Sequence, residues 1–214
     1  MKLKRATIAA IVAICVLFLT KTLATFLPDQ FKQLGTARVA VTLSTLAALV
    51  IVYFYYVFYR DYARVDQPAL RKASLLAAIG AGLVAVLYIK GFLLVFDLYV
   101  TRFLLRAHLF EAMAPWLASI ISLIFFIVFL NETPGLERPR LKKAIRLAVI
   151  ASGVGIIERT IVLYNYLQIR ESPYASGLPR AAQTAFIPFI IFAVGALVYF
   201  FVVFYQEQRA AVAE

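Results

Sequence analysis

Six polar side chains stand within long apolar stretches of the sequence, and they are the residues best placed to do chemistry. If those stretches cross a membrane, each charged group at a helix centre costs about 2.5–3.5 kcal/mol to insert, so such groups commonly mark binding or transport sites. The candidate intramembrane polar site consists of Lys21, Tyr88, Lys90, Asp97, Glu158 and Arg159.

The charges of this set leave room for an anionic partner. Its basic residues outnumber its acidic ones, and the excess could meet a phosphate headgroup, a solute anion or an acidic residue of another subunit. We expect Glu158 to pair with Lys21, and Arg159 or Lys90 to meet Asp97. Structural pairing between helices, or extension of the basic side chains to the lipid headgroups, is the alternative to a ligand-binding role.

No catalytic or metal-ligating pattern stands out. His108 is the only histidine and Cys15 the only cysteine, so the chain offers no histidine-rich metal site, intrachain disulfide or redox motif. It also lacks the nucleophile-elbow, phosphate-loop and His-Glu-x-x-His motifs. We therefore expect no catalytic residues, no metal and no cofactor beyond bound lipid, with a quinone or pigment left open.

The composition places these residues in a membrane. The 214-residue chain is 64% hydrophobic and has a mean hydropathy of +0.88, which is too apolar for a soluble core of ordinary size. Six runs reach the roughly 20 residues that a helix needs to cross the hydrocarbon layer. We expect one transmembrane domain, residues 1–214, with spans at approximately 6–27, 39–59, 73–101, 109–130, 144–168 and 184–205.

An internal repeat orders these spans into pairs. Three segments that lie 67 and then 71 residues apart open with the same pattern, namely Leu3-Lys4-Arg5-Ala6, Leu70-Arg71-Lys72-Ala73 and Leu141-Lys142-Lys143-Ala144. The second helix of each pair closes alike, with Val57-Phe58-Tyr59, Val128-Phe129-Leu130 and Val203-Phe204-Tyr205. The fold class expected is an all-α membrane protein of three tandem helical hairpins, a pseudo-threefold repeat with units 3–61, 70–132 and 141–207.

The repeat sets a common register for the first helix of each unit. Counted from the leucine that opens each unit, positions 3, 7 and 10 hold small residues on one helical face, which predicts close helix packing. Position 18 lies five whole turns from that leucine, so Lys21, Tyr88 and Arg159 should face the interior in the outer leaflet. Lys90 breaks the symmetry, because it lies about 200° round the helix from Tyr88 and shares a face with Asp97.

Aromatic residues gather at the expected cytoplasmic end of the second helix in each repeat unit. The favoured interpretation is a cytoplasmic belt that anchors the bundle at the depth of the headgroups. An aromatic-lined site for a lipid, quinone or pigment is the alternative, because so dense a run must also turn some rings toward protein. The belt residues expected are Tyr53, Tyr55, Tyr56, Tyr59, Tyr199 and Tyr205.

The chain carries a net charge of +11, and its basic residues are unevenly distributed along the sequence. Most Lys and Arg residues fall in the N-terminal segment, the second and fourth loops and the tail, which by the positive-inside rule makes both termini cytoplasmic. We expect a plasma or inner membrane, contact with anionic headgroups at the cytoplasmic face, and no nucleic-acid binding, since no basic stretch forms a groove-entering helix.

Three functions remain open from the sequence. The first is a non-catalytic subunit or scaffold that binds lipid and other membrane chains or copies of itself. The second is a channel or transporter for a small anion or anionic amphiphile, which would use the basic residues in the outer half of the membrane. The third and weakest is an enzyme that modifies lipids at the membrane surface.

Overall fold

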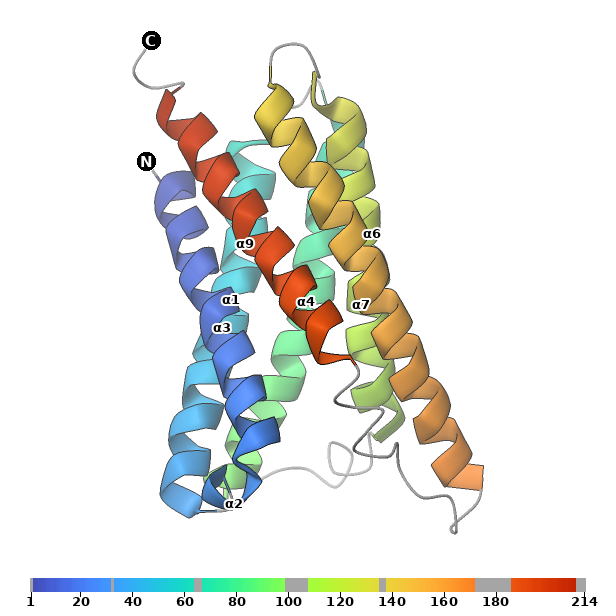
Figure 1. Ribbon diagram of the computed structural model, residues 1–214. Coiled ribbons are helices and arrows are strands. Elements are labelled where there is room, and N and C mark those ends of the chain that lie inside the picture. Colours follow the sequence, from blue (N-terminus) through green and yellow to red (C-terminus); the bar gives the residue numbers. More distant parts are fainter. Residues whose placement is uncertain are drawn as a thin grey trace.

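The computed structural model describes residues 2–31, 33–63, 67–98, 108–134, 138–171 and 186–210. Within these ranges the chain is all-helical (Figure 1). Six long helices are α1 (Lys2–Phe26), α3 (Leu34–Asp61), α4 (Pro68–Val95), α6 (His108–Glu132), α7 (Pro139–Glu171) and α9 (Ile187–Ala210), and a single turn, α2 (Pro28–Phe31), follows α1. Each long helix is long and apolar enough to span a membrane, which confirms an all-α architecture with six candidate spans.

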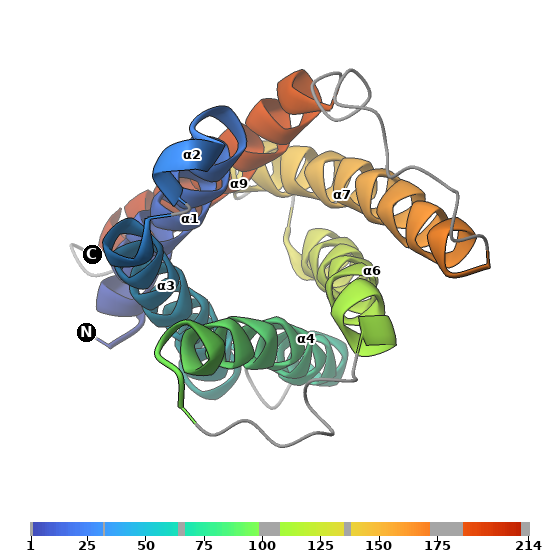
Figure 2. The same ribbon diagram turned by 90° about the horizontal axis from the view of Figure 1, so that it is seen from below.

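The long helices form a closed ring in chain order (Figure 2). α1 packs against α3, α3 against α4, α4 against α6, α6 against α7, α7 against α9, and α9 back against α1. The start of α1 and the end of α9 lie at the same end of the ring (Figure 1). We call this the basic end, because Lys4, Arg71, Lys142 and Arg209 all belong to it, and the other the distal end.

Small residues bring the helices together near the basic end. Gly80 of α4 is buried, and a Cβ added to it would lie 3.2 Å from the side chain of Ile121 on α6. Such close approach maximises dispersion contact, which is the main attraction available between helices in lipid. The predicted stripe is therefore buried as expected. Its alanines, none of which exposes more than 4% of its surface, are Ala6, Ala10, Ala13, Ala73, Ala77, Ala144, Ala148 and Ala151.

An aromatic core fills the centre of the ring beside that stripe. Phe58 of α3, Phe129 of α6 and Phe204 of α9 form a triangle whose ring centroids lie 5.4, 6.0 and 5.5 Å apart. Edge-to-face and tilted pairs at these separations are favourable aromatic contacts. The phenylalanines that are at least 98% buried in this core are Phe54, Phe58, Phe125, Phe126, Phe129, Phe200, Phe201 and Phe204.

A second layer of the core repeats one contact three times. Tyr55 packs edge-on against Phe125 at 5.2 Å, Phe126 against Phe200 at 5.0 Å, and Phe201 against Phe54 at 4.8 Å. The first pair joins α3 to α6, the second joins α6 to α9, and the third joins α9 back to α3. The aromatic core therefore closes the interior of the bundle at the basic end.

The tyrosines expected in the belt divide between two environments. Tyr53, Tyr56 and Tyr199 are exposed on the outside of the ring, and Tyr59 and Tyr205 are half-buried. Tyr55 differs from the expectation, because it exposes only 8% of its surface and belongs to the aromatic core. Its place two residues from Tyr53 turns it by about 200° on the helix, which carries it from the lipid side to the interior.

α4 ends earlier than the sequence predicted. Asp97 adopts a positive φ of 54°, the N–H of Leu98 donates to the carbonyl of Leu93, and the N–H of Asp97 donates to that of Leu94. This is the Schellman arrangement that terminates helices. Arg38 of α3 supports the same end, since its Nε donates to the carbonyl of Val95. Asp97 is consequently exposed beyond the helix and does not share a helical face with Lys90.

Candidate functional site

A cavity of about 360 Å³ lies inside the ring, between the aromatic core and the distal end. All six long helices contribute to its wall, and Tyr55 and Phe201 of the aromatic core line it as well. A second hollow of about 180 Å³ shares Leu17, Tyr55 and Ser122 with it. We call the larger space the central cavity. Its volume falls within the range of about 300–1,000 Å³ that is usual for small-molecule sites.

The wall of the central cavity follows the register of the three sequence units. Position 14 of each unit contributes Leu17, Val84 and Gly155, and position 18 contributes Lys21, Tyr88 and Arg159. The cavity is also lined by Ile51, Ser122 and Leu197. These residues lie seven positions before the phenylalanines of the aromatic triangle. The prediction that Lys21, Tyr88 and Arg159 face the interior is therefore confirmed, and position 14 is the additional signal that would have located the cavity.

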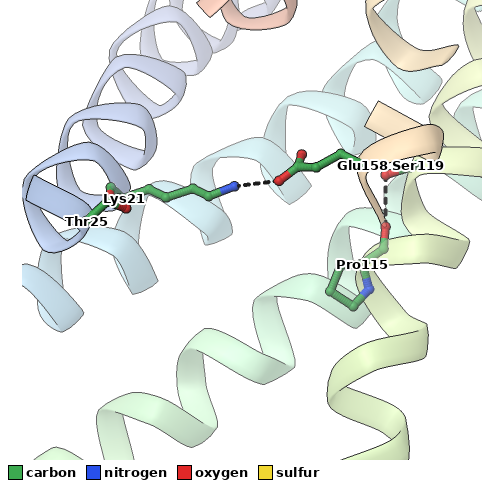
Figure 3. Close-up of polar contacts among 5 residues, drawn as sticks. All are labelled: Lys21, Thr25, Pro115, Ser119 and Glu158. Carbon is green, nitrogen blue, oxygen red and sulfur yellow. Dashed lines mark hydrogen bonds and ion pairs between the residues drawn. The ribbon is translucent and has the colours of Figure 1, made fainter. Parts of the chain in front are cut away.

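A salt bridge crosses the cavity from α1 to α7. The Nζ of Lys21 lies 3.0 Å from an Oε atom of Glu158, which confirms the pairing expected from the sequence (Figure 3). α9 stands between these two helices in the ring, so the bridge joins elements that are not ring neighbours. The Lys21 side chain is 48% exposed and that of Glu158 only 18%.

Arg159 also lines the cavity, one residue after Glu158. Within the described parts of the chain, no carboxylate lies within salt-bridge distance of its guanidinium. The other polar side chain beside it is Tyr88, which also lines the cavity. Lys21 and Glu158 neutralise each other, and the charged residues of the wall therefore sum to one positive charge. An apolar cavity with one uncompensated cation suits a ligand that carries an anionic group.

Lys90 and Asp97 do not belong to this site. Lys90 is buried and pairs with Glu111 of α6, not with Asp97 as expected. The early end of α4 is the reason, because it removes Asp97 from the helical face of Lys90. The Lys90–Glu111 pair lies outside the wall of the central cavity and ties α4 to α6.

Polar contacts between neighbouring helices hold the wall in place. Trp116 of α6 donates its Nε1–H to the Oγ1 of Thr160 on α7 at 3.0 Å, and the Oγ atoms of Ser122 and Ser152 lie 3.4 Å apart. Thr45 of α3 donates to the carbonyl of Tyr88 on α4 at 3.1 Å. These bonds fix the helices that carry Tyr88 and Arg159. The interhelical contacts of Trp116 and Glu111 were not expected from the sequence, because single polar residues in apolar helices show no periodic signal.

The acidic, histidine and cysteine side chains that the structure describes are scattered. Among the described residues, no group of three or more His, Cys, Asp or Glu side chains is placed to hold a metal ion. The polar side-chain groups that line the central cavity are one carboxylate, one ammonium, one guanidinium and several hydroxyl groups.

The fold and the site together define an integral membrane protein with an internal cavity, whose mostly apolar wall includes a few charged and polar side chains. No protein-family model matches the chain, and no curated protein or solved structure shows significant similarity to it.

Proposed function

We propose that this protein binds an anionic amphiphile in the central cavity and carries it across the membrane. The observation that carries the proposal is the guanidinium of Arg159, which lacks an acidic partner among the described residues and lines an apolar cavity formed by six helices. The amphiphile would place its anionic group against Arg159 and Tyr88, and its alkyl chain against the apolar wall. This is the second of the functions that the sequence left open.

The apolar wall favours an amphiphile over a small inorganic anion. Leu17, Ile51, Val84 and Leu197 line the cavity from four different helices. Other apolar residues of the wall include Phe18, Phe186, Phe189, Ile190 and Val194. A hydrated anion gains nothing from such a surface, whereas a hydrocarbon chain is well matched to it. The aromatic core closes the cavity toward the basic end, which suits a transporter that opens to one side at a time more than it suits an open channel.

The scaffold function depends on other features. Buried small residues and an apolar outer surface are expected in any membrane bundle that packs well, and they support subunit, lipid or self contacts without requiring a cavity. A charged, hollow interior is costly for a purely structural role. The cavity, which the sequence did not reveal, therefore makes the transport function the better supported of the two.

The proposal includes a threefold origin and a cytoplasmic orientation for the basic end. The aromatic core supports the repeat, because three equivalent pairs of aromatic side chains make the same contact between α3, α6 and α9. The equivalent residues at positions 14 and 18 of the units support it as well. The concentration of Lys and Arg supports the orientation, by the positive-inside rule.

Binding of decanesulfonate tests the proposal. The protein is placed in phosphatidylcholine nanodiscs, and binding is measured for wild type and for Arg159→Gln. We expect the variant to bind about 10- to 100-fold more weakly, because a hydrogen bond to a charged group is worth about 1.5–3 kcal/mol. Arg146→Gln is the matched control, since it removes the same charge from an exposed position of α7.

Equal binding by Arg159→Gln and wild type would overturn the proposal. Transport is measured separately in proteoliposomes loaded with radiolabelled decanesulfonate, where wild type and Arg146→Gln should release the label and Arg159→Gln should not. Decyl maltoside, which carries the same chain and no charge, should compete poorly for the site.

A further inference from the structure

The Lys21–Glu158 salt bridge lies in the wall of the central cavity. Among the described residues, Glu158 is the only carboxylate that lines the cavity, and it lies beside Arg159 in the sequence. Its charge cancels that of Lys21, which would otherwise add a second cation to the wall. The state of one carboxylate therefore decides how strongly the cavity attracts an anion.

We infer that Glu158 is a proton-binding site that couples proton uptake to binding of the anionic amphiphile, an inference that depends on the proposed function. Protonation neutralises Glu158 and releases Lys21 from its salt bridge. The wall then carries two uncompensated positive charges, those of Lys21 and Arg159, in place of one. By linkage, a bound anion must in turn favour the protonated form of Glu158, so ligand and proton bind together.

The groups around Glu158 fit this role. α1 presents Lys21 and Thr25, but Thr25 already donates its hydroxyl to the backbone carbonyl of Lys21 at 2.9 Å. α6 presents Ser119, whose hydroxyl donates to the carbonyl of Pro115 at 2.9 Å (Figure 3). Among the described residues, the polar contact of the Glu158 carboxylate is thus the bridge to Lys21.

The remaining titratable groups that line the cavity are basic or phenolic. They are Arg159 on α7, Tyr88 on α4 and Tyr55 on α3, and the residues that α9 contributes are apolar. Lysine, arginine and tyrosine side chains ordinarily keep their protons up to about pH 10 or above. A proton taken up on ligand binding at neutral pH therefore points to Glu158.

Protonation of Glu158 would also remove a link between two helices. Lys21 and Glu158 join α1 to α7 across α9. When Glu158 is neutral, the only described link of this kind between α1 and α7 is lost, and Lys21 is free to turn toward the ligand. Binding, proton uptake and loss of the cross-cavity link then occur as one event.

The test measures decanesulfonate binding as a function of pH in nanodiscs. A sulfonate keeps its charge throughout, so any proton exchanged belongs to the protein. We expect wild-type affinity to rise as the pH falls, by at most about tenfold per pH unit for one linked proton and by about 5- to 150-fold in total. A pH indicator in weak buffer should report proton uptake when decanesulfonate is added to wild type.

The variants separate this inference from the proposed function. Glu158→Gln should bind with the affinity that wild type reaches at low pH, without pH dependence and without proton uptake. Lys21→Gln/Glu158→Gln removes both residues of the pair. It should bind decanesulfonate more weakly than Glu158→Gln does, and again independently of pH. His108→Gln, which removes the only histidine of the chain, should keep the wild-type pH dependence.

Two results would overturn proton coupling. One is pH-independent binding by wild type, and the other is full pH dependence in Glu158→Gln. In either case a loss of binding in Arg159→Gln would leave the proposed function intact. If Arg159→Gln bound as tightly as wild type, the proposed function itself would be wrong and the coupling would fall with it.

Discussion

Individual side chains decide what the central cavity can hold. Lys21, Tyr88 and Arg159 were expected to face the interior from the register alone, and all three line the cavity. The register could not show that Lys90 pairs with Glu111, because that contact depends on where α4 ends and on how α6 turns. A helix end set by a positive φ at Asp97 is hard to read from sequence, since glycine is the usual residue there.

Filling the cavity should block ligand binding without harming the fold. Gly155 lines the central cavity, and a Cβ there meets only the Oγ of Ser119 at 4.0 Å, so Gly155→Leu should be accommodated and should project into the cavity. We expect decanesulfonate binding to fall at least tenfold. Gly153→Leu, on the same helix and with nothing within 4 Å of its Cβ, should bind like wild type. A loss of similar size in both variants would show that the cavity is not the site.

The helices of the bundle are held by two kinds of packing. Alanines on the predicted stripe bring backbones together, and phenylalanines fill the centre where three helices meet. The stripe was predicted correctly because its period is that of a helix. The inward turn of Phe54, Tyr55 and Phe58 was less evident, because aromatic residues occupy every side of that helix and the sequence shows no polar face to contrast with them.

Overpacking the alanine stripe should destabilise the bundle. Ala10 is fully buried on α1, and Ala10→Leu should lower the free energy of unfolding by about 1–3 kcal/mol, because the neighbouring helices must shift to admit the larger side chain. Thermal unfolding in detergent measures the effect. Ile8→Leu, at an exposed position two residues earlier, is the control and should be nearly neutral. Equal unfolding temperatures for the two variants would contradict this role of the stripe.

Removing a ring of the aromatic triangle should cost more than removing an exposed ring. Phe204→Ala deletes a fully buried side chain of α9, whereas Phe189→Ala deletes one that is 56% exposed on the same helix. The buried change costs about 3–5 kcal/mol in soluble cores, and the part that comes from lost dispersion contacts persists in lipid. Thermal unfolding in detergent should separate the two variants clearly. A smaller loss for Phe204→Ala would show that the triangle contributes little.

The whole molecule is a ring that is closed at the basic end and hollow toward the distal end. The sequence led to six spans and an all-helical bundle, because hydropathy and helix length suffice for that. It could not reveal the cavity, which results from the tilt of the helices around the aromatic core. The order of the helices in the ring follows their order in the chain.

The orientation of the ring in the membrane can be tested with single cysteines. In a Cys15→Ala background, Gln30→Cys lies at the distal end and Gln206→Cys near the basic end, both at exposed positions. We expect a membrane-impermeant maleimide added to intact cells to label Gln30→Cys and to leave Gln206→Cys unlabelled until the cells are opened. The reverse pattern would place the basic end outside, against the positive-inside rule.

Photo-crosslinking locates the ligand most directly. An alkyl sulfonate with a diazirine in its chain is bound to the wild-type protein in nanodiscs, irradiated, and its attachment sites are mapped by mass spectrometry. We expect labels on the cavity wall, at Leu17, Val194 and Leu197, and their loss in Arg159→Gln but not in Arg146→Gln. Labels confined to the outer surface, at residues such as Leu46 and Tyr53, or unchanged labelling in Arg159→Gln, would contradict a binding site within the ring.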